Sequence, residues 1–406
     1  MVTARILFYH SIMNRKLVRF IGKWFLALSA MAVVLSLFIL SMRPVGAVLP
    51  RNDLIVLQVE GDPFGTSAEN VFIVDTRTLR TYPYHLSNTG HAPVFSPDGE
   101  HLAFITLEGA GGEIYVADWT GRNARNISNH SADDAAPVWS PGGKHIAFVS
   151  RRDRNRELFI ADVETGEVRR AFANDTAPLL LFLDVQWSPD GRYILINDRA
   201  TLTLVDVANG ERRTIDRVDV LSAAWSPDGA QIAYGVMRGA AMQLLVADVA
   251  ADSVRGLDTR LLVGLSPRWS PDSKALLYVA GTTVNSADIF SMDMDENFAH
   301  NLTSGGLSDI MPAWSPDGTK IVFASMRDNQ WEIYRMNADG TNTVNLSNHP
   351  AHESNPVWSP DGKQILFVSA RESSLRPGVY LMNADGSHQR RIAQVEGAVT
   401  VRMWRQ

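Results

Sequence analysis

Six acidic residues recur shortly before a repeated aromatic residue, and together they could attract a cation or a basic peptide. Each lies three to six residues before the Trp that opens one copy of a Trp-Ser-Pro-Asp-Gly-like motif. Because equivalent places in a repeat come to the same face, we expect these carboxylates to surround one mouth of a central channel. The candidate binding residues are Asp133, Asp134, Asp184, Asp219, Asp309 and Glu353.

Arginines with the same repeat allow a second interpretation of these acids. Four follow the motif Trp by thirteen residues and one follows it by twelve, namely Arg152, Arg238, Arg327, Arg371 and Arg199. They fall in loops that we expect on the same face, where they could pair with the acids and cancel the local field. Exposed ion pairs contribute only about 0–1 kcal/mol each, so a ligand could displace them. The sequence leaves both interpretations open.

Four histidines belong to the same set of loops, and imidazole nitrogens are common ligands of transition metals. They are His91, His130, His349 and His352. Their spacing defines no ligand set. We therefore predict that they are solvated loop residues, and we predict no metal site and no cofactor.

The sequence motifs of common enzyme classes do not occur in this chain. It contains no Gly-x-Ser-x-Gly nucleophile elbow, no His-Glu-x-x-His zinc motif and no phosphate-binding loop. The glycine-rich stretch Glu108–Glu113 lies between two predicted strands, whereas a phosphate cradle requires a helix after the loop. We assign no catalytic residue.

The repeated motif predicts a strand, a tight turn and a second strand. Ser-Pro-Asp-Gly favours a turn because Pro fixes φ, Asp bonds its own backbone and Gly accepts a positive φ. Apolar residues then alternate with the period of a β-strand. Phe95, Gly142 and Ser273 depart from the motif and predict less regular turns. The seven copies begin at Phe95, Trp139, Trp187, Trp225, Trp269, Trp314 and Trp358, at intervals of 38 to 48 residues.

The two ends of the repeated region predict how many sheets form. A third and a fourth strand follow each motif, and a period near 44 residues with this content is typical of a β-propeller. Three strands are predicted before the first motif, at Leu54–Val59, Asn70–Asp75 and Thr78–Tyr82, and one after the last repeat, at Ala398–Trp404. Joined in one sheet, they predict an all-β, eight-bladed propeller closed by both ends of the chain. Seven blades are the alternative.

This repeat resembles the WD40-like PD40 repeat of the TolB-type β-propellers over roughly residues 53–406. It is also similar to the propeller portions of prolyl oligopeptidase-type and dipeptidyl-peptidase-type proteins. We find here neither the N-terminal α/β domain of TolB nor the hydrolase domain of those peptidases. The resemblance therefore implies the fold. Because some TolB-like propellers are metal-dependent lyases, it also implies an alternative activity.

Composition and charge limit the classes of partner. The chain has 406 residues, 45% of them hydrophobic, and no cysteine, so neither disulfides nor thiolate metal sites contribute to its stability. Residues 1–52 hold seven Lys and Arg residues and no acid, which leaves 31 basic against 44 acidic residues in the rest of the chain. An acidic body argues against a nucleic-acid partner, because phosphate binding requires a basic surface.

The N-terminal region predicts export. Residues 24–42 form a run of nineteen residues without a charge, preceded by five basic residues. A helix of this length roughly spans the ~30 Å hydrocarbon layer, and the basic flank favours a cytoplasmic N-terminus. The run could be a signal-anchor that stays in the membrane, or a signal peptide cleaved near Ala47, which would release a secreted protein.

Taken together, these patterns predict an exported and membrane-anchored propeller that lies outside the cytoplasm, in the periplasm or on the cell surface. We divide the chain into a basic cytoplasmic segment (1–23), a transmembrane segment or signal (24–42), a linker (43–52) and the propeller (53–406). We expect a non-catalytic binding or scaffold module for a protein, a peptide or an envelope polymer. The alternative is a metal-dependent lyase or hydrolase with its site at the same channel mouth.

Overall fold

The protein is represented by a computed structural model. It describes residues 54–60, 70–75, 80–84, 91–106, 111–119, 121–152, 156–172, 184–217, 219–238, 241–257, 267–281, 286–305, 307–372, 377–394 and 398–405. All of them belong to one compact unit, Pro44–Gln406. The predicted cytoplasmic segment, transmembrane segment and linker lie outside the described residues. In the part of the chain that is described, no helix has the length and apolar character needed to cross a membrane.

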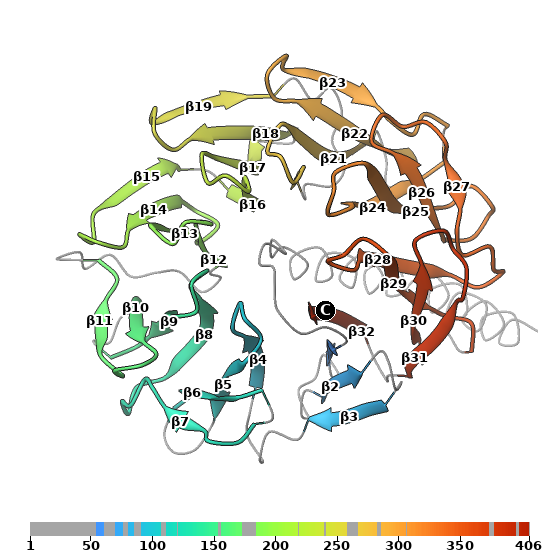
Figure 1. Cartoon of the computed structure of the whole chain (residues 1–406). Helices are drawn as coiled ribbons and strands as arrows, with labels where there is room; N and C mark the ends of the chain where they lie inside the picture. Colours follow the sequence, from blue (N-terminus) through green and yellow to red (C-terminus); the bar gives the residue numbers. More distant parts are fainter. Residues whose placement is uncertain are drawn as a thin grey trace, which may run out of the picture. The chain divides into compact units, whose positions relative to one another are not determined.

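The described strands form four-stranded antiparallel sheets, each built from strands that follow one another in sequence. In each sheet the first strand lies toward the middle of the unit and the fourth lies outermost (Figure 1). The first three sheets after the N-terminal strands contain β4 (His91–Phe95), β5 (His101–Thr106), β6 (Glu113–Asp118) and β7 (Arg125–Asn126); β8 (Asp134–Trp139), β9 (His145–Ser150), β10 (Glu157–Asp162) and β11 (Val168–Arg170); and β12 (Asp184–Trp187), β13 (Tyr193–Asn197), β14 (Leu202–Asp206) and β15 (Arg212–Asp216).

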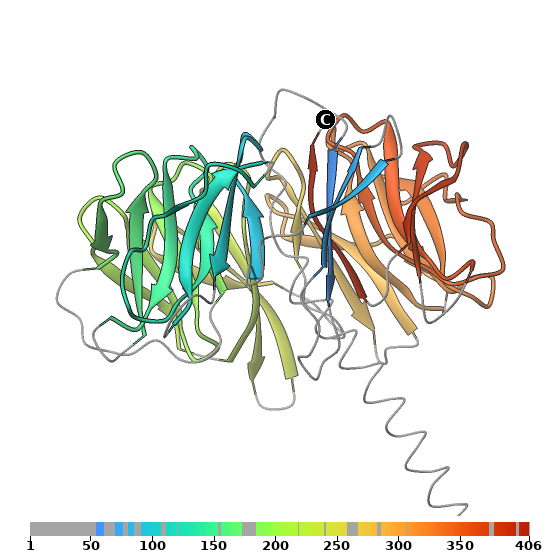
Figure 2. The ribbon, with the colours of Figure 1, turned by 90° about the horizontal axis from the view of Figure 1, so that it is seen from below.

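The next four sheets repeat this arrangement. They contain β16 (Asp219–Trp225), β17 (Gln231–Arg238), β18 (Ala241–Asp248) and β19 (Ser253–Gly256); β20 (Arg268–Trp269), β21 (Ala275–Gly281), β22 (Ala287–Asp293) and β23 (Phe298–Asn301); β24 (Asp309–Trp314), β25 (Lys320–Ser325), β26 (Glu332–Asn337) and β27 (Val344–Asn345); and β28 (Glu353–Trp358), β29 (Gln364–Ser369), β30 (Gly378–Asn383) and β31 (Arg390–Gln394). Viewed at right angles to Figure 1, the strands run between two faces where the turns and loops gather (Figure 2).

One further sheet combines the two ends of the described chain. Its strand order is β3-β2-β1-β32, where β1 is Leu54–Glu60, β2 is Asn70–Asp75, β3 is Arg80–Tyr84 and β32 is Ala398–Arg405. The predicted pairing of the C-terminal strand with the first N-terminal strand is therefore observed, with Ile55 opposite Trp404. The predicted fourth strand was placed two residues too early, because the strand begins at Arg80 and includes Pro83, which an outermost strand tolerates.

The Ser-Pro-Asp-Gly turns have the geometry that their residues favour. In the first copy, the N–H of Gly99 donates to the carbonyl of Ser96 at 2.8 Å, and the Ser96 hydroxyl donates to Asp98 at 2.5 Å. Gly99 has φ +67°. The prediction of a less regular turn at Ser273 was wrong. Ser273 adopts φ +63°, its N–H makes the equivalent bond, and its hydroxyl accepts the N–H of Asp228 in the preceding sheet.

The motif Trp side chains connect each sheet to the preceding one. The indole N–H of Trp139 donates to the carbonyl of Val94 at 2.8 Å, and Val94 immediately precedes the motif aromatic of its own sheet. The other bonds of this type are Trp187 to Val138, Trp269 to Ala224, Trp314 to Arg268 and Trp358 to Ala313, at 3.1 to 3.2 Å. These tryptophans are therefore structural.

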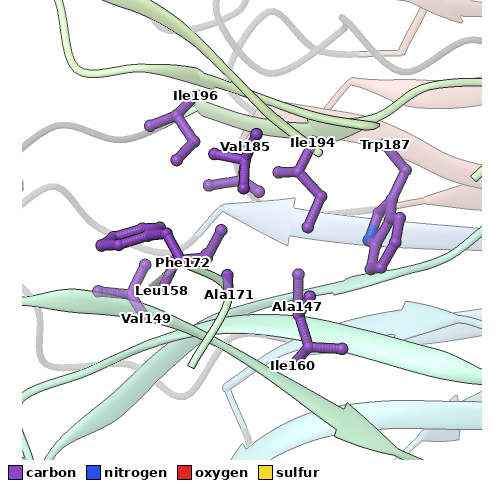
Figure 3. Packing of buried hydrophobic residues seen from close by; sticks show 11 residues of the cluster. Ala147, Val149, Leu158, Ile160, Ala171, Phe172, Val185, Trp187, Ile194 and Ile196 are labelled. Carbon is purple, nitrogen blue, oxygen red and sulfur yellow. The ribbon is translucent and has the colours of Figure 1, made fainter. Parts of the chain in front are cut away.

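The hydrophobic core lies between consecutive sheets. Figure 3 shows one such cluster, in which Val149 and Ile160 of the β8–β11 sheet face Val185 and Ile194 of the β12–β15 sheet. Each middle strand contacts a neighbouring sheet on both of its faces, which explains why both faces are apolar. Ile146, Ala147 and Phe148, three residues in a row, are all 0% exposed.

Candidate functional site

The strand register places the predicted acids at the end of each sheet that lies opposite the Ser-Pro-Asp-Gly turns. Asp134 is opposite Ser150, and Ser150 is opposite Glu157, so the three residues form a row across the end of the β8–β11 sheet. The loops that join consecutive sheets and the loops between second and third strands lie at this end. We call it the joining-loop face.

Three of the six predicted acids are buried in ion pairs on this face. Asp134 Oδ2 lies 3.2 Å from Arg152 Nη2, and Asp309 Oδ2 lies 3.0 Å from Arg327 Nη2. Glu353 Oε1 lies 3.0 Å from Arg371 Nε. The three carboxylate side chains are 0–1% exposed. The ion-pair interpretation is thus what the structure shows for these three acids.

Each of these arginines also packs over aromatic rings of its own sheet. The guanidinium of Arg371 lies 5.4 Å from the ring centre of Phe367 and 4.9 Å from that of Tyr380. Arg152 over Phe148 and Phe159, and Arg327 over Phe323 and Tyr334, repeat this contact. A cation over an aromatic face is stabilised by the ring quadrupole. The arginines are therefore fixed by a charge on one side and by rings on the other.

A second acid from the preceding sheet stands beside each ion pair, and sequence reasoning missed it. These acids begin or nearly begin the third strand, and each lies 21 residues before its partner: Glu113 before Asp134, Asp288 before Asp309, and Glu332 before Glu353. The backbone N–H of Asp134 donates to the carbonyl of Gly112 at 2.7 Å, and Glu353 bonds Trp331 in the same way. The constant interval of 21 residues, followed by 18 to the arginine, is the signal that could have revealed them.

Burial changes the acidity of the paired carboxylates. It raises the pKa of Glu353 to about 7, although Arg371 and the Ser369 hydroxyl oppose the change. Burial also raises the pKa of Asp134 against the lowering effects of the Ser150 and Ser128 hydroxyls and Arg152. One oxygen of each buried acid, Asp134 Oδ1, Asp309 Oδ1 and Glu353 Oε2, has no hydrogen-bond partner among the described residues.

The remaining three predicted acids are more accessible and lie apart from one another. Asp133 is exposed, accepts the N–H of Gly112 at 3.1 Å and lies 3.6 Å from Arg151. Asp184 is half-buried and accepts a hydrogen bond from the Gln186 amide at 2.7 Å. Asp219 is exposed at the start of β16. The structure therefore places the six acids on one face but not in one cluster.

The arginine of the β16–β19 sheet takes a different partner. Arg238 Nη2 lies 3.8 Å from Asp216 of the preceding sheet, and the Tyr234 hydroxyl donates to the same carboxylate at 3.0 Å. The residue five before Trp225 is Val220, which is 0% exposed, where Asp134, Asp309 and Glu353 stand in their sheets. Arg238 consequently has no acid at the equivalent place.

The histidines of the joining loops fix loop backbone. His130 Nδ1 accepts the N–H of Ala132, and His349 Nδ1 accepts that of Ala351, both at 3.1 Å. His352 Nδ1 accepts the N–H of Trp331 at 3.2 Å. His130 and His352 are exposed, whereas partial burial and the charge of Arg371 lower the pKa of His349. The side chain of His91 lies outside the described residues.

The arrangement favours recognition by a fixed surface. Across the described ranges, no group of three or more His, Asp or Glu side chains is placed to hold a metal ion. Arg152 connects the buried Asp134 to the joining loop itself, because its Nη2 donates to the carbonyl of Ser128 at 2.6 Å. The ion pairs therefore hold the joining loops in place, while Asp133 and Asp219 present carboxylates to solvent.

Comparison with protein families agrees with this architecture. The model of the TolB β-propeller domain matches residues 63–215, 199–345 and 265–404. The chain belongs to the TolB β-propeller domain family. The predicted all-β propeller fold of TolB-like PD40 repeats is thereby confirmed.

Individual relatives are similar over parts of the chain. The uncharacterized protein Atu1656 of Agrobacterium fabrum is 32% identical over 157 residues, which cover 37% of this chain and 53% of that protein. The uncharacterized peptidase YuxL of Bacillus subtilis is 26% identical over 218 residues, 53% of this chain and 25% of YuxL. The chain thus spans about half and a quarter of the lengths of these relatives. The structure of dihydro-heme d1 dehydrogenase NirN matches with a TM-score of 0.60 and 15% identity over 90% of this chain and 78% of that one, which shows the fold alone.

Proposed function

We propose that this TolB-family propeller is a non-catalytic binding or scaffold module whose ligand contacts the joining-loop face. The observation that carries the proposal is the repeated ion pair that braces this face. Asp134, Asp309 and Glu353 are buried against arginines that are themselves packed on aromatic rings. Loops held this firmly lose little conformational entropy on binding, which favours affinity and specificity.

The six acids then divide into two roles. Asp134, Asp309 and Glu353 brace the rim, and the more accessible Asp133, Asp184 and Asp219 contact the ligand. Since the accessible contacts are carboxylates on an acidic body, a protein or peptide with a basic surface is the complementary partner. We further propose that the propeller comprises eight blades over residues 53–406 and lies outside the cytoplasm, anchored through residues 24–42.

The charge on the joining-loop face can be tested with a fluorescent oligolysine peptide as the probe. In the double variant Asp133→Asn/Asp219→Asn, we expect the affinity at low salt to fall roughly three- to tenfold and the salt dependence to weaken. The matched control, Asp295→Asn/Glu296→Gln, removes the same charge from exposed residues of the opposite face. Equal losses in both double variants would show that only net charge matters and would refute the assignment.

A photo-crosslinking residue can locate the natural partner directly. Introduced at position 133 or 219 in cells that express the chain, it should give discrete crosslinked products. The same residue at position 295 or 296 should give none. Products that form only from positions 295 and 296 would move the binding surface to the turn face.

A further inference from the structure

The interface between the β20–β23 and β24–β27 sheets differs from the two equivalent interfaces by one methylene group. The preceding-sheet acid is Asp288 here, whereas it is a glutamate at the other two. Glu332 reaches the Ser347 hydroxyl and accepts the N–H of His349 at 2.9 Å. Glu113 makes the same contacts, at 2.7 Å to the Ser128 hydroxyl and 3.3 Å to the N–H of His130. Protein donors therefore satisfy both glutamates.

Asp288 is poorly satisfied by comparison. Its Oδ2 accepts the Asn301 amide at 2.9 Å, but its Oδ1 is buried and has no hydrogen-bond partner within the described ranges. The hydroxyl equivalent to Ser347 belongs to Thr303, which instead accepts the N–H of Ile289 at 2.8 Å. The place of His349 is taken by Gly305. One carboxylate oxygen thus remains without a protein donor.

Asp309 brings a second unsatisfied oxygen to the same interface. Its side chain is 1% exposed and its Oδ2 is paired with Arg327, but its Oδ1 has no partner in the part of the chain that the structure describes. Strands β22 and β24, which carry the two aspartates, are in contact. Burial and then the charge of Asp309 raise the pKa of Asp288, while Asn301 and Arg327 oppose this. Two carboxylates and one guanidinium leave a net negative charge in a buried place, which is costly unless it is neutralised.

We propose that this interface binds one hard divalent cation, best matched by Ca²⁺, between Oδ1 of Asp288 and Oδ1 of Asp309. Carboxylate oxygens are the ligands that Ca²⁺ prefers, and its flexible shell of six to eight oxygens accepts water at the other places. Mg²⁺ fits less well because it demands a regular octahedron and gives up its water reluctantly. With only two protein carboxylates we expect a dissociation constant on the order of 10⁻⁴–10⁻³ M, the range of extracellular calcium modules.

Equilibrium dialysis of the full-length chain against ⁴⁵Ca²⁺ in mild detergent tests the site, with thermal unfolding as a second measurement. We expect one Ca²⁺ per chain and a saturable rise in Tm of roughly 1–3 °C that MgCl₂ at equal ionic strength does not reproduce. Both effects should be lost in Asp288→Asn, which replaces one ligand oxygen and retains the side-chain shape. The matched control Glu332→Gln, at the interface already satisfied by protein donors, should bind Ca²⁺ as the wild type does.

Several results would overturn the proposal. The absence of bound Ca²⁺ at 5 mM would do so, as would an unchanged stoichiometry in Asp288→Asn. Loss of binding in Glu332→Gln, or a stoichiometry of three, would show that the interface with Asp288 is not special. If Asp288→Asn does not fold, Asp288→Glu retains the charge and can reach Thr303, and it should likewise lose Ca²⁺.

Discussion

Two kinds of inter-sheet interface occur in this propeller, and they solve the same packing problem differently. Where the β24–β27 sheet meets the β28–β31 sheet, Trp358 donates its indole N–H to Ala313, and the buried Glu353 is paired with Arg371. Where the β12–β15 sheet meets the β16–β19 sheet, Trp225 Nε1 is buried and has no hydrogen-bond partner among described residues. Val220 occupies the place of the buried acid.

Side-chain amides replace the indole bond at the second interface. The Gln186 amide donates to the carbonyl of Ala223 at 3.0 Å, and the Asn197 amide donates to that of Val220 at 3.3 Å. Gln186 immediately precedes Trp187, and its carbonyl would be the acceptor equivalent to Ala313. The polar elements therefore change together. The lesson is that a buried acid is kept only where its arginine and hydroxyl partners are present, because an unpaired buried charge is strongly destabilising.

The largest expected effect comes from removing the interface that the chain ends create. Deletion of residues 396–406 removes β32, the inner strand beside β1, and leaves the β1–β3 sheet with an unpaired edge. We expect cooperative unfolding in urea to be lost or split into several transitions. A single transition with an unchanged midpoint would show that the terminal sheet contributes nothing to closure.

Removing an arginine should distinguish the two kinds of interface. Arg371→Met leaves Glu353 buried without its partner and should reduce the free energy of unfolding at pH 8 by about 3–5 kcal/mol. Arg238→Met removes a pair at 3.8 Å whose arginine side chain is 51% exposed, and should cost about 0–1 kcal/mol. Urea denaturation measures both. Similar losses would mean that burial of the ion pair does not matter.

The pH dependence should follow from Glu353. Its pKa is about 7 in the folded protein and near 4.5 when unfolded, so the folded state binds the extra proton between these values. This group therefore favours folding below pH 4.5 and loses that contribution as the pH rises through 7, by about 3 kcal/mol at most. Glu353→Gln should flatten the decline in unfolding free energy between pH 5 and 8, whereas Asp295→Asn should not. An identical decline in Glu353→Gln would contradict this reasoning.

The smallest expected difference concerns the indole bonds. Trp358→Phe loses a buried hydrogen bond and leaves the Ala313 carbonyl unsatisfied, whereas Trp225→Phe loses only ring contacts. We expect the first variant to be less stable than the second by about 1 kcal/mol. Thermal and urea unfolding of the two proteins provide the comparison. Should Trp225→Phe prove the more damaging change, an acceptor for Trp225 would have to exist in solution.

Much of the fold was determined by local features of the sequence. The tight turn of Ser-Pro-Asp-Gly, the alternation of apolar residues after it and the period near 44 residues specify strands and their order without any long-range contact. The pairing of Ala398–Arg405 with Leu54–Glu60 could also be deduced, because unpaired strands at both ends of a repeat complete one sheet. The strand at Arg80–Tyr84 was displaced by two residues in the prediction because its pattern is short and contains Pro83.

What each acid on the joining-loop face does was decided by the tertiary structure. Asp133 and Asp134 are neighbours in sequence, yet one is exposed and the other is 0% exposed, because successive side chains at a strand start point in opposite directions. Spacing alone placed both at the same end of a sheet. Only the packing of one sheet against the next brought Glu113 and Arg152 around Asp134 and made its charge an internal one, because partners 18 and 21 residues away meet through strand register and not through local sequence.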